Sequence, residues 1–239
     1  MKVRGAVLLA LVALASSCGG ASAPTASPPS RTVLATAKAG PPAAVPLSGT
    51  NLLVAGDAGV RIVALDGTTV GDLPGLQPVF SGGPTTYLRA PDGEVVQIQP
   101  DGSLVAATPP RQVLRDNGPN LDLPPFPGGP DGHAEGFWVW SSTSPDGRTA
   151  LAQWSGECES QSAWFVSGGH DPRPVARAAD GTWLASFPLG WLADGRAVVV
   201  FPDAACGTPI ATPGTYTVTP SGSASLLNAT VPFGLLIRP

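Results

Sequence analysis

Two cysteine thiols stand at matching distances from two similar turns, and covalent pairing is the chemistry their placement favours. Cys158 lies twelve residues after Asp146 of Pro-Asp-Gly-Arg, and Cys206 lies twelve residues after Asp194 of Ala-Asp-Gly-Arg. Neither thiol has a second Cys or a His at metal-ligand spacing, which favours a disulfide over reactive or metal-binding thiols. The bridge would join equivalent loops of two neighbouring copies of one unit and close a loop of 48 residues. In the chain-entropy description such a loop contributes about 4 kcal/mol of stability.

The N-terminus predicts export, and therefore a compartment in which a disulfide persists. Lys2 and Arg4 precede an apolar stretch, Ala6–Ala15, which is followed by small residues up to Cys18. This is the pattern of a secretory signal peptide, and ten apolar residues are too few to span a bilayer. The end of the stretch, Leu14-Ala15-Ser16-Ser17-Cys18, resembles the lipobox of bacterial lipoproteins. The resemblance implies that residues 1–18 are the signal peptide and that Cys18 becomes the lipid-modified N-terminus, which leaves the other two cysteines to pair.

A low-complexity segment follows the lipobox. In residues 19–48, 24 of 30 positions are Ala, Pro, Ser, Gly or Thr, so the segment cannot bury a core and is expected to be a disordered tether. A flexible chain of this length reaches about 30 Å. The formal charge of −4 and the lack of a basic patch argue against nucleic acid as a partner. Loss of Lys2 and Arg4 with the signal leaves 11 basic and 17 acidic residues, a charge of −6, which suits a domain that does not lie flat on anionic lipid. The chain is expected on the extracytoplasmic face of the cell membrane, held by its lipid (in the periplasm if the cell is Gram-negative).

Repeated Asp-Gly pairs predict β-hairpins through residues 49–239. Seven such pairs occur, most of them between short runs of strand-forming residues, where Gly adopts positive φ at little cost. The 30 Gly and 28 Pro make long helices improbable. Two units match best, Ser144–Val166 and Leu192–Val218, and each contains a turn, an apolar strand, a Cys-bearing loop and a second strand.

The turn Ser144-Pro145-Asp146-Gly147-Arg148 resembles the hallmark of the TolB-like β-propeller repeat. Ala193–Arg196 and Ala90–Gly93 match the same hallmark in part. The resemblance implies an all-β, β-propeller-like array of antiparallel meanders. About 190 residues at roughly 45 per blade correspond to about four to five blades, with truncated blades as an alternative. A β-sandwich built from the same hairpins is the competing fold.

No catalytic or metal-binding constellation emerges, so no cofactor is expected. His133 and His170 lie in Gly- and Pro-rich loops without a second His nearby, and solvated loop residues are the favoured interpretation. Asp116–Asp122 has alternating oxygen donors, but it lacks the Gly and Glu that complete a calcium loop. The proline-rich segment Asp116–Gly136 is either a projecting binding loop or a stiff linker.

Six tryptophans could pack between blades or form a ligand platform. Strand aromatics usually pack in the core, whereas a platform for a sugar ring needs several rings exposed together at a loop face. Trp154 and Trp164 flank the Cys158 loop and are therefore the candidate binding residues.

These observations predict a cell-envelope lipoprotein that acts as a binding or scaffold module through a propeller face, with an envelope protein or glycan as partner. One alternative is a cell-wall carbohydrate-active hydrolase or lyase, which would need carboxylates such as Asp146 and Asp194 to converge in a central channel. Because those aspartates are better explained as turn residues, a non-enzyme is favoured. A structural accessory subunit of an envelope complex is the other alternative.

Overall fold

The computed structural model describes a chain of β-strands. It describes residues 47, 49–79, 83–109, 114–115, 118–119, 123–124, 136–156, 161–168, 172–177, 179, 181, 183–203 and 212–237. No helix occurs in these ranges. Accordingly, none of the described segments is a helix long and apolar enough to cross a membrane.

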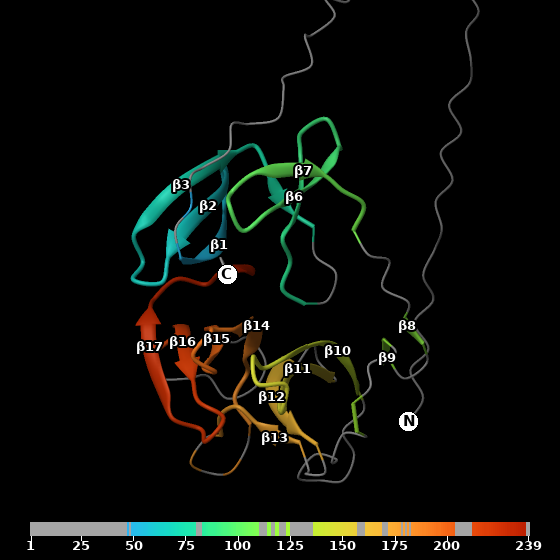
Figure 1. The fold of residues 1–239 in the computed structure, drawn as a ribbon, viewed down its shortest axis with the longest axis vertical. Helices are drawn as coiled ribbons and strands as arrows, with labels where there is room; N and C mark the ends of the chain where they lie inside the picture. The colour runs from blue at the N-terminus through green and yellow to red at the C-terminus, as the bar shows by residue number, and fades with distance from the viewer. Residues whose placement is uncertain are drawn as a thin grey trace, which may run out of the picture. The chain divides into compact units, whose positions relative to one another are not determined.

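Four antiparallel sheets form the blades of a propeller (Figure 1). Blade 1 contains β1 (Thr50–Gly56), β2 (Gly59–Ala64), β3 (Thr69–Pro74) and β18 (Gly234–Ile237). Blade 2 contains β4 (Gln77–Pro78), β5 (Tyr87–Arg89), β6 (Val95–Ile98) and β7 (Leu104–Ala106). Blade 3 contains β10 (Gly136–Thr143), β11 (Thr149–Gly156), β12 (Gln161–Ser167) and β13 (Arg173–Pro174). Blade 4 contains β14 (Phe187–Trp191), β15 (Ala197–Phe201), β16 (Gly214–Val218) and β17 (Ala224–Asn228). A small sheet of β8 (Leu114–Arg115) and β9 (Gly118–Pro119) falls between blades 2 and 3 along the chain.

The predicted all-β propeller is confirmed, with four blades in the described part of the chain. The β-sandwich alternative is wrong, because the hairpins are distributed over four separate four-stranded sheets rather than two. Each blade has its full set of strands, although β5, β6 and β7 of blade 2 have only three or four residues each. The weakly patterned first half of the sequence therefore forms two complete blades, of which blade 2 has short strands.

The two ends of the propeller are fastened to each other in blade 1. Its strand order is β18-β1-β2-β3, so the last strand of the chain occupies the place that the first strand takes in each of the other blades. The register pairs Thr50 with Ile237 and Leu53 with Gly234. Phe233 extends the fastening on both sides: its N–H donates to Leu53 O at 2.8 Å, and its carbonyl accepts from Thr85 N of blade 2 at 3.2 Å. This contact joins residues at opposite ends of the chain and had no counterpart in the sequence patterns.

The Asp-Gly turns use both residues in a defined way. The glycines have positive φ, as predicted: Gly67, Gly93, Gly102, Gly147, Gly181 and Gly195. In the turns at Asp66, Asp92, Asp101, Asp146 and Asp194, the aspartate Oδ1 accepts the backbone N–H two residues on, for example from Glu94 to Asp92 at 3.0 Å. In that turn Ala90 N also donates to Glu94 O, and Gly93 N donates to Ala90 O. These bonds define a three-residue hairpin loop with a glycine in the left-handed region.

The position of each turn within its blade tests the repeat alignment. The Asp146 and Asp194 turns both connect the first strand of a blade to the second, β10 to β11 and β14 to β15, so the two best units are equivalent. The Asp92 turn instead connects β5 to β6, the second and third strands of blade 2. The partial match of Ala90–Gly93 therefore reflects shared turn chemistry rather than the same position in a blade.

Hydrophobic clusters fill three of the junctions between blades. Leu53, Ile62 and Leu73 of blade 1 pack with Leu88 and Ile98 of blade 2. The opposite face of blade 1 packs against blade 4 in a second cluster, with Leu52, Val54, Val63, Val198 and Val200. A third cluster joins blades 3 and 4. Alternation along β1 thus sends Leu52 and Leu53 to opposite faces, as expected for a strand buried on both sides.

Candidate functional site

Trp154 and Trp164 are buried, so the exposure expected of these two candidate binding residues is wrong. Their exposed fractions are 5% and 1%. The registers explain why: Trp154 is paired with Trp138 of β10, while Trp164 pairs with Ala152 of β11, which leaves space for a large ring beside it. The indole of Trp164 also donates to Ser162 Oγ at 2.7 Å. Proximity to a loop suggested exposure, but the strand registers place the rings on one packed face.

These side chains belong to a larger aromatic surface, which we call the tryptophan face: Trp138, Trp154, Trp164 and Trp183. Their rings meet edge to face, at centroid distances of 5.2 Å for Trp138–Trp154, 6.4 Å for Trp138–Trp164 and 5.4 Å for Trp164–Trp183. Edge-to-face pairs are the favoured arrangement of aromatic quadrupoles. Trp183 is half-buried and pairs with Arg177 in an isolated bridge between β13 and β14.

A segment from the connection between blades 2 and 3 lies on the tryptophan face. Leu123 is half-buried and packs against the cluster, and Pro124 is exposed. The Trp138 indole Nε1–H donates to the Pro124 carbonyl at 3.0 Å. The proline-rich segment 116–136 had two interpretations, a projecting loop and a stiff linker. Leu123 and Pro124 belong to this segment, and both contact blade 3.

The tryptophan face differs from the three blade junctions described above. The hydrophobic cluster that contains it holds residues of β10, β11 and β12, with Leu123 and Trp183 packed against them, and none of its described members belongs to blade 2. Blade 2 does approach blade 3 at Gly83, which lies directly against the Trp140 ring. At the other junctions, strand side chains of the neighbouring blade cover this kind of surface. On blade 3 it is covered instead by Leu123, which lies outside the blades.

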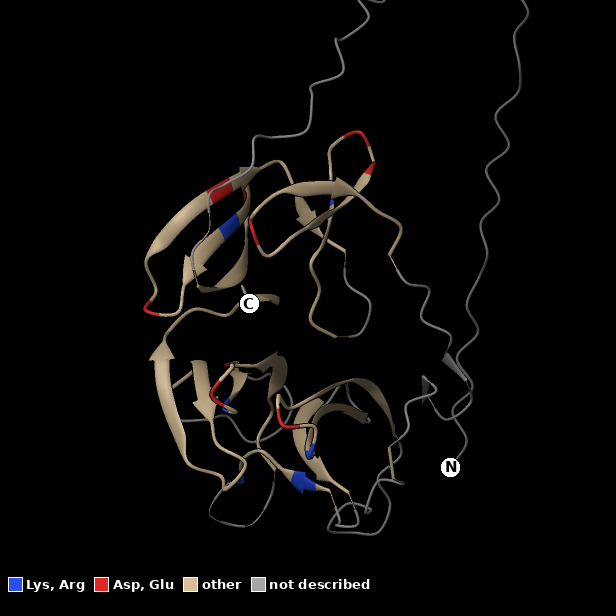
Figure 2. Cartoon of the chain, in the orientation of Figure 1, with Lys and Arg blue, Asp and Glu red and all other residues tan. Residues whose placement is uncertain are grey.

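The strands that carry the face have no charged side chain. The sequences of β10, β11 and β12 contain no Lys, Arg, Asp or Glu. In Figure 2 the coloured positions of blade 3 lie in its turn and on β13, not on these three strands. These three strands therefore offer a ligand apolar contact and neutral hydrogen bonds.

Asp146 and Asp194 act in their own turns, as the sequence suggested. Asp146 Oδ1 accepts from Ser144 Oγ at 2.6 Å and from Arg148 N at 3.1 Å. Asp194 accepts from Arg196 Nε at 2.8 Å and forms an ion pair with Arg196 at 2.6 Å. The Ser144 hydroxyl, and then the Arg148 N–H, hold the pKa of Asp146 below its ordinary value. The Arg196 side chain has the same effect on the pKa of Asp194.

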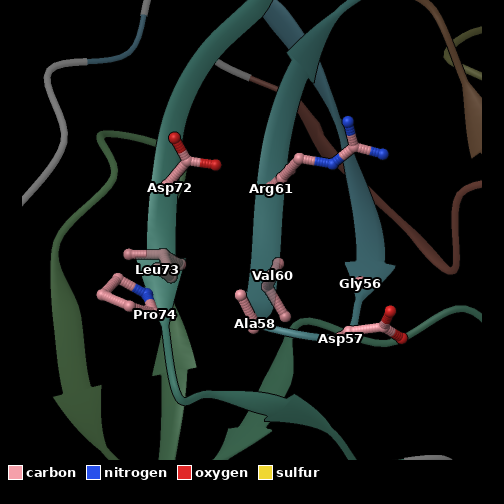
Figure 3. A pocket seen from close by; sticks show the side chains of 9 residues that line it. Gly56, Asp57, Ala58, Val60, Arg61, Asp72, Leu73 and Pro74 are labelled. Carbon is pink, nitrogen blue, oxygen red and sulfur yellow. The ribbon is translucent and has the colours of Figure 1, made fainter.

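An open hollow of about 510 Å³ lies on blade 1, at the β1–β2 turn and the facing part of β3. Its exposed charged groups are Asp57, Arg61 and Asp72 (Figure 3). Arg61 and Asp72 are cross-strand partners, yet Figure 3 shows the guanidinium turned away from the carboxylate. Both groups are exposed, and an ion pair between such groups would contribute little to stability.

Several predicted site residues lie outside the described residues. They are Cys18, Cys158, Cys206, His133, His170 and the segment Asp116–Asp122 apart from β9 (Gly118–Pro119). In chain order Cys158 falls between β11 and β12, and Cys206 falls between β15 and β16, which are equivalent connections of blades 3 and 4. The disulfide stays a prediction. Within the described ranges, no three His, Cys, Asp or Glu side chains gather as a metal site.

A scan against protein-family models and searches of the curated proteins and of the solved structures return no match. The resemblance to TolB-like repeats therefore rests on the turn motif at Ser144–Arg148. The four-bladed architecture rests on the strand pairings themselves.

Proposed function

We propose that the chain is a lipid-anchored envelope protein whose propeller acts as a binding or scaffold module for an envelope protein or glycan. The observation that carries the proposal is the contact of the tryptophan face with Leu123 and Pro124. It is an aromatic surface with an indole donor directed at a peptide carbonyl. Such surfaces hold polypeptide by shape and by a few hydrogen bonds.

The predicted tether supports this function. Lipid on Cys18 and a flexible chain over residues 19–48 would keep the propeller within roughly 30 Å of the membrane. Confinement near the membrane raises the effective concentration of the propeller toward other membrane-bound components, so modest intrinsic affinity suffices.

The hydrolase or lyase alternative would need two carboxylates free to work on a sugar. The best candidates, Asp146 and Asp194, are each engaged in hydrogen bonds within their own turns. Lowered pKa values also suit a permanently ionised turn residue rather than a general acid, which needs a raised pKa. An accessory subunit would also bind a partner, but the consequence of its binding would be a more stable larger assembly.

The test is cross-linking of the tagged full-length chain in envelope membranes of the organism that encodes it. We expect a discrete cross-linked partner with the wild-type chain and with Gly168→Ala, whose new Cβ meets nothing within 4 Å. We expect loss of that partner with Gly234→Ala, which disturbs the fastening of the propeller. Recovery of no specific partner would contradict the proposal, and release of soluble sugar from envelope glycan would favour the hydrolase.

A further inference from the structure

We infer that the tryptophan face is a recognition site for an extended, apolar peptide that contains proline, and that the chain's own Leu123–Pro124 occupies it in this structure. The inference rests on the proposed binding function and names the site and the class of partner. Its basis is the seating of Leu123 against the indoles and the hydrogen bond from Trp138 Nε1 to the Pro124 carbonyl.

The contact has the chemistry of proline-peptide recognition. An indole N–H can only donate, and a peptide carbonyl can only accept, so the bond fixes the direction of the peptide backbone at Pro124. Pro124 itself is exposed and contributes its carbonyl to the contact, and because proline lacks an N–H it leaves no backbone donor without a partner beside the indole. Proline-rich segments are also preformed in extended conformation and lose little entropy when they dock on aromatic surfaces.

The uncharged strands narrow the class of ligand further. Because β10, β11 and β12 carry no charged side chain, an acidic or basic peptide would gain no ion pair from these three strands and would lose hydration. An aliphatic residue followed by proline matches what is seated on the face. Binding of such a peptide should therefore depend little on salt concentration.

Occupation of the face by Leu123–Pro124 limits the binding of other peptides. A segment joined to the face by its own chain competes at an effective concentration on the order of millimolar, so a free ligand must bind more tightly or arrive already tethered. The apparent affinity for an outside peptide falls in proportion to the fraction of chains in which the face is open. An envelope partner held near the same membrane fulfils the tethering condition.

The first experiment uses a synthetic peptide of residues 119–128, PNLDLPPFPG, added to the full-length chain with its indole groups followed by ¹⁵N NMR. The control peptide carries Leu123→Ser and Pro124→Ala. In the full chain with Leu123→Ser, we expect the peptide to shift the Trp138 indole signal and leave that of Trp191 in place. The wild-type chain should need about tenfold more peptide, because its own segment competes.

Two matched variants show where the peptide binds. Trp138 and Trp191 each donate an indole N–H to a backbone carbonyl at 3.0 Å, Trp138 on the tryptophan face and Trp191 to Ser142 in the junction of blades 3 and 4. In the Leu123→Ser background, Trp138→Phe should abolish the peptide's effect on the remaining indoles, and Trp191→Phe should preserve it. A chain that remains folded with Leu123→Ser, yet shows no shift of Trp138 at any peptide concentration, would overturn the inference.

Hydrogen exchange in the wild-type chain covers the case in which Leu123→Ser fails to fold. If the segment opens reversibly, the Trp138 indole N–H should exchange at least about tenfold faster than that of Trp191, and the peptide should slow it. Equal rates without an effect of the peptide would make Leu123–Pro124 a permanent plug and refute the site. A partner recovered from the envelope while the peptide fails overturns only this inference; a peptide that binds without any envelope partner overturns only the proposed function.

Discussion

Substitution of Gly234 tests whether β18 holds the propeller together. A Cβ built on Gly234 would stand 2.1 Å from the backbone oxygen of Thr85 and 3.2 Å from Leu53. Because a backbone oxygen cannot rotate away, Gly234→Ala must separate the strand from blade 2. The separation also threatens the 3.2 Å bond from Thr85 N to the Phe233 carbonyl. The variant therefore disturbs the contact between blades 1 and 2 by adding a single carbon atom.

The expected loss follows from two contributions. Forcing an extra carbon into a packed contact raises the free energy of the folded state by about 1–3 kcal/mol. Loss of one backbone hydrogen bond adds about 1 kcal/mol. For a domain of this size, each kcal/mol lowers Tm by about 2–4 °C, so Gly234→Ala should lower Tm by roughly 4–16 °C.

Thermal unfolding of the full-length chain, followed by near-ultraviolet circular dichroism, measures this difference. Gly168→Ala is the matched control, because its Cβ meets nothing within 4 Å. The control should leave Tm unchanged or raise it slightly, since alanine restricts the unfolded chain. If Gly234→Ala melts within a degree or two of Gly168→Ala, β18 does not fasten the propeller as argued.

Three further predictions concern single groups. Asp146 has a pKa below its ordinary 3.8, so its stabilising contribution is complete above that value and is lost as the pH falls through the lowered pKa. Asp146→Asn should therefore lower stability at neutral pH and flatten its decline in acid, as read from Tm against pH; an unchanged acid profile would contradict this. Reduction should add two hydrogen atoms to the mass if Cys158 and Cys206 are bridged, and replacing both by Ser should lower stability by up to about 4 kcal/mol. Mass spectrometry of membrane-extracted protein should find Cys18 as a lipid-modified N-terminus, and an unmodified thiol there would exclude the anchor.

The turns could be predicted because their causes are local. Asp66, Asp92 and Asp101 each accept the N–H two residues on, and the next residue is a glycine with positive φ. Every atom of such a turn lies within five residues of sequence, so a sequence pattern contains the whole interaction. The same locality explains why the Asp92 turn resembled the complete motif although it connects different strands of its blade.

The candidate site could not be predicted, because its geometry comes from strand registers. Trp154 and Trp164 lie next to a loop in sequence, but pairing across β10, β11 and β12 places them on a packed face with Trp138. The seat of Leu123 is also non-local, since it depends on a surface formed only after those strands pair. The run Phe137-Trp138-Val139-Trp140 signalled an aromatic strand, but a register shift between Trp138 and Trp140 places Trp138 on the tryptophan face and Trp140 against the cluster of blades 3 and 4.

The tryptophan face lies apart from the contacts that hold the blades together. Three blade junctions are filled by side chains from both blades, and β18 fastens the chain ends within blade 1. Among the described residues, the contacts of Leu123 and Pro124 lie on the tryptophan face. A ligand that displaces the segment therefore has to offset the free energy of this local contact, not the free energy of unfolding of the whole propeller. Under this condition a folded domain can exchange one bound segment for another.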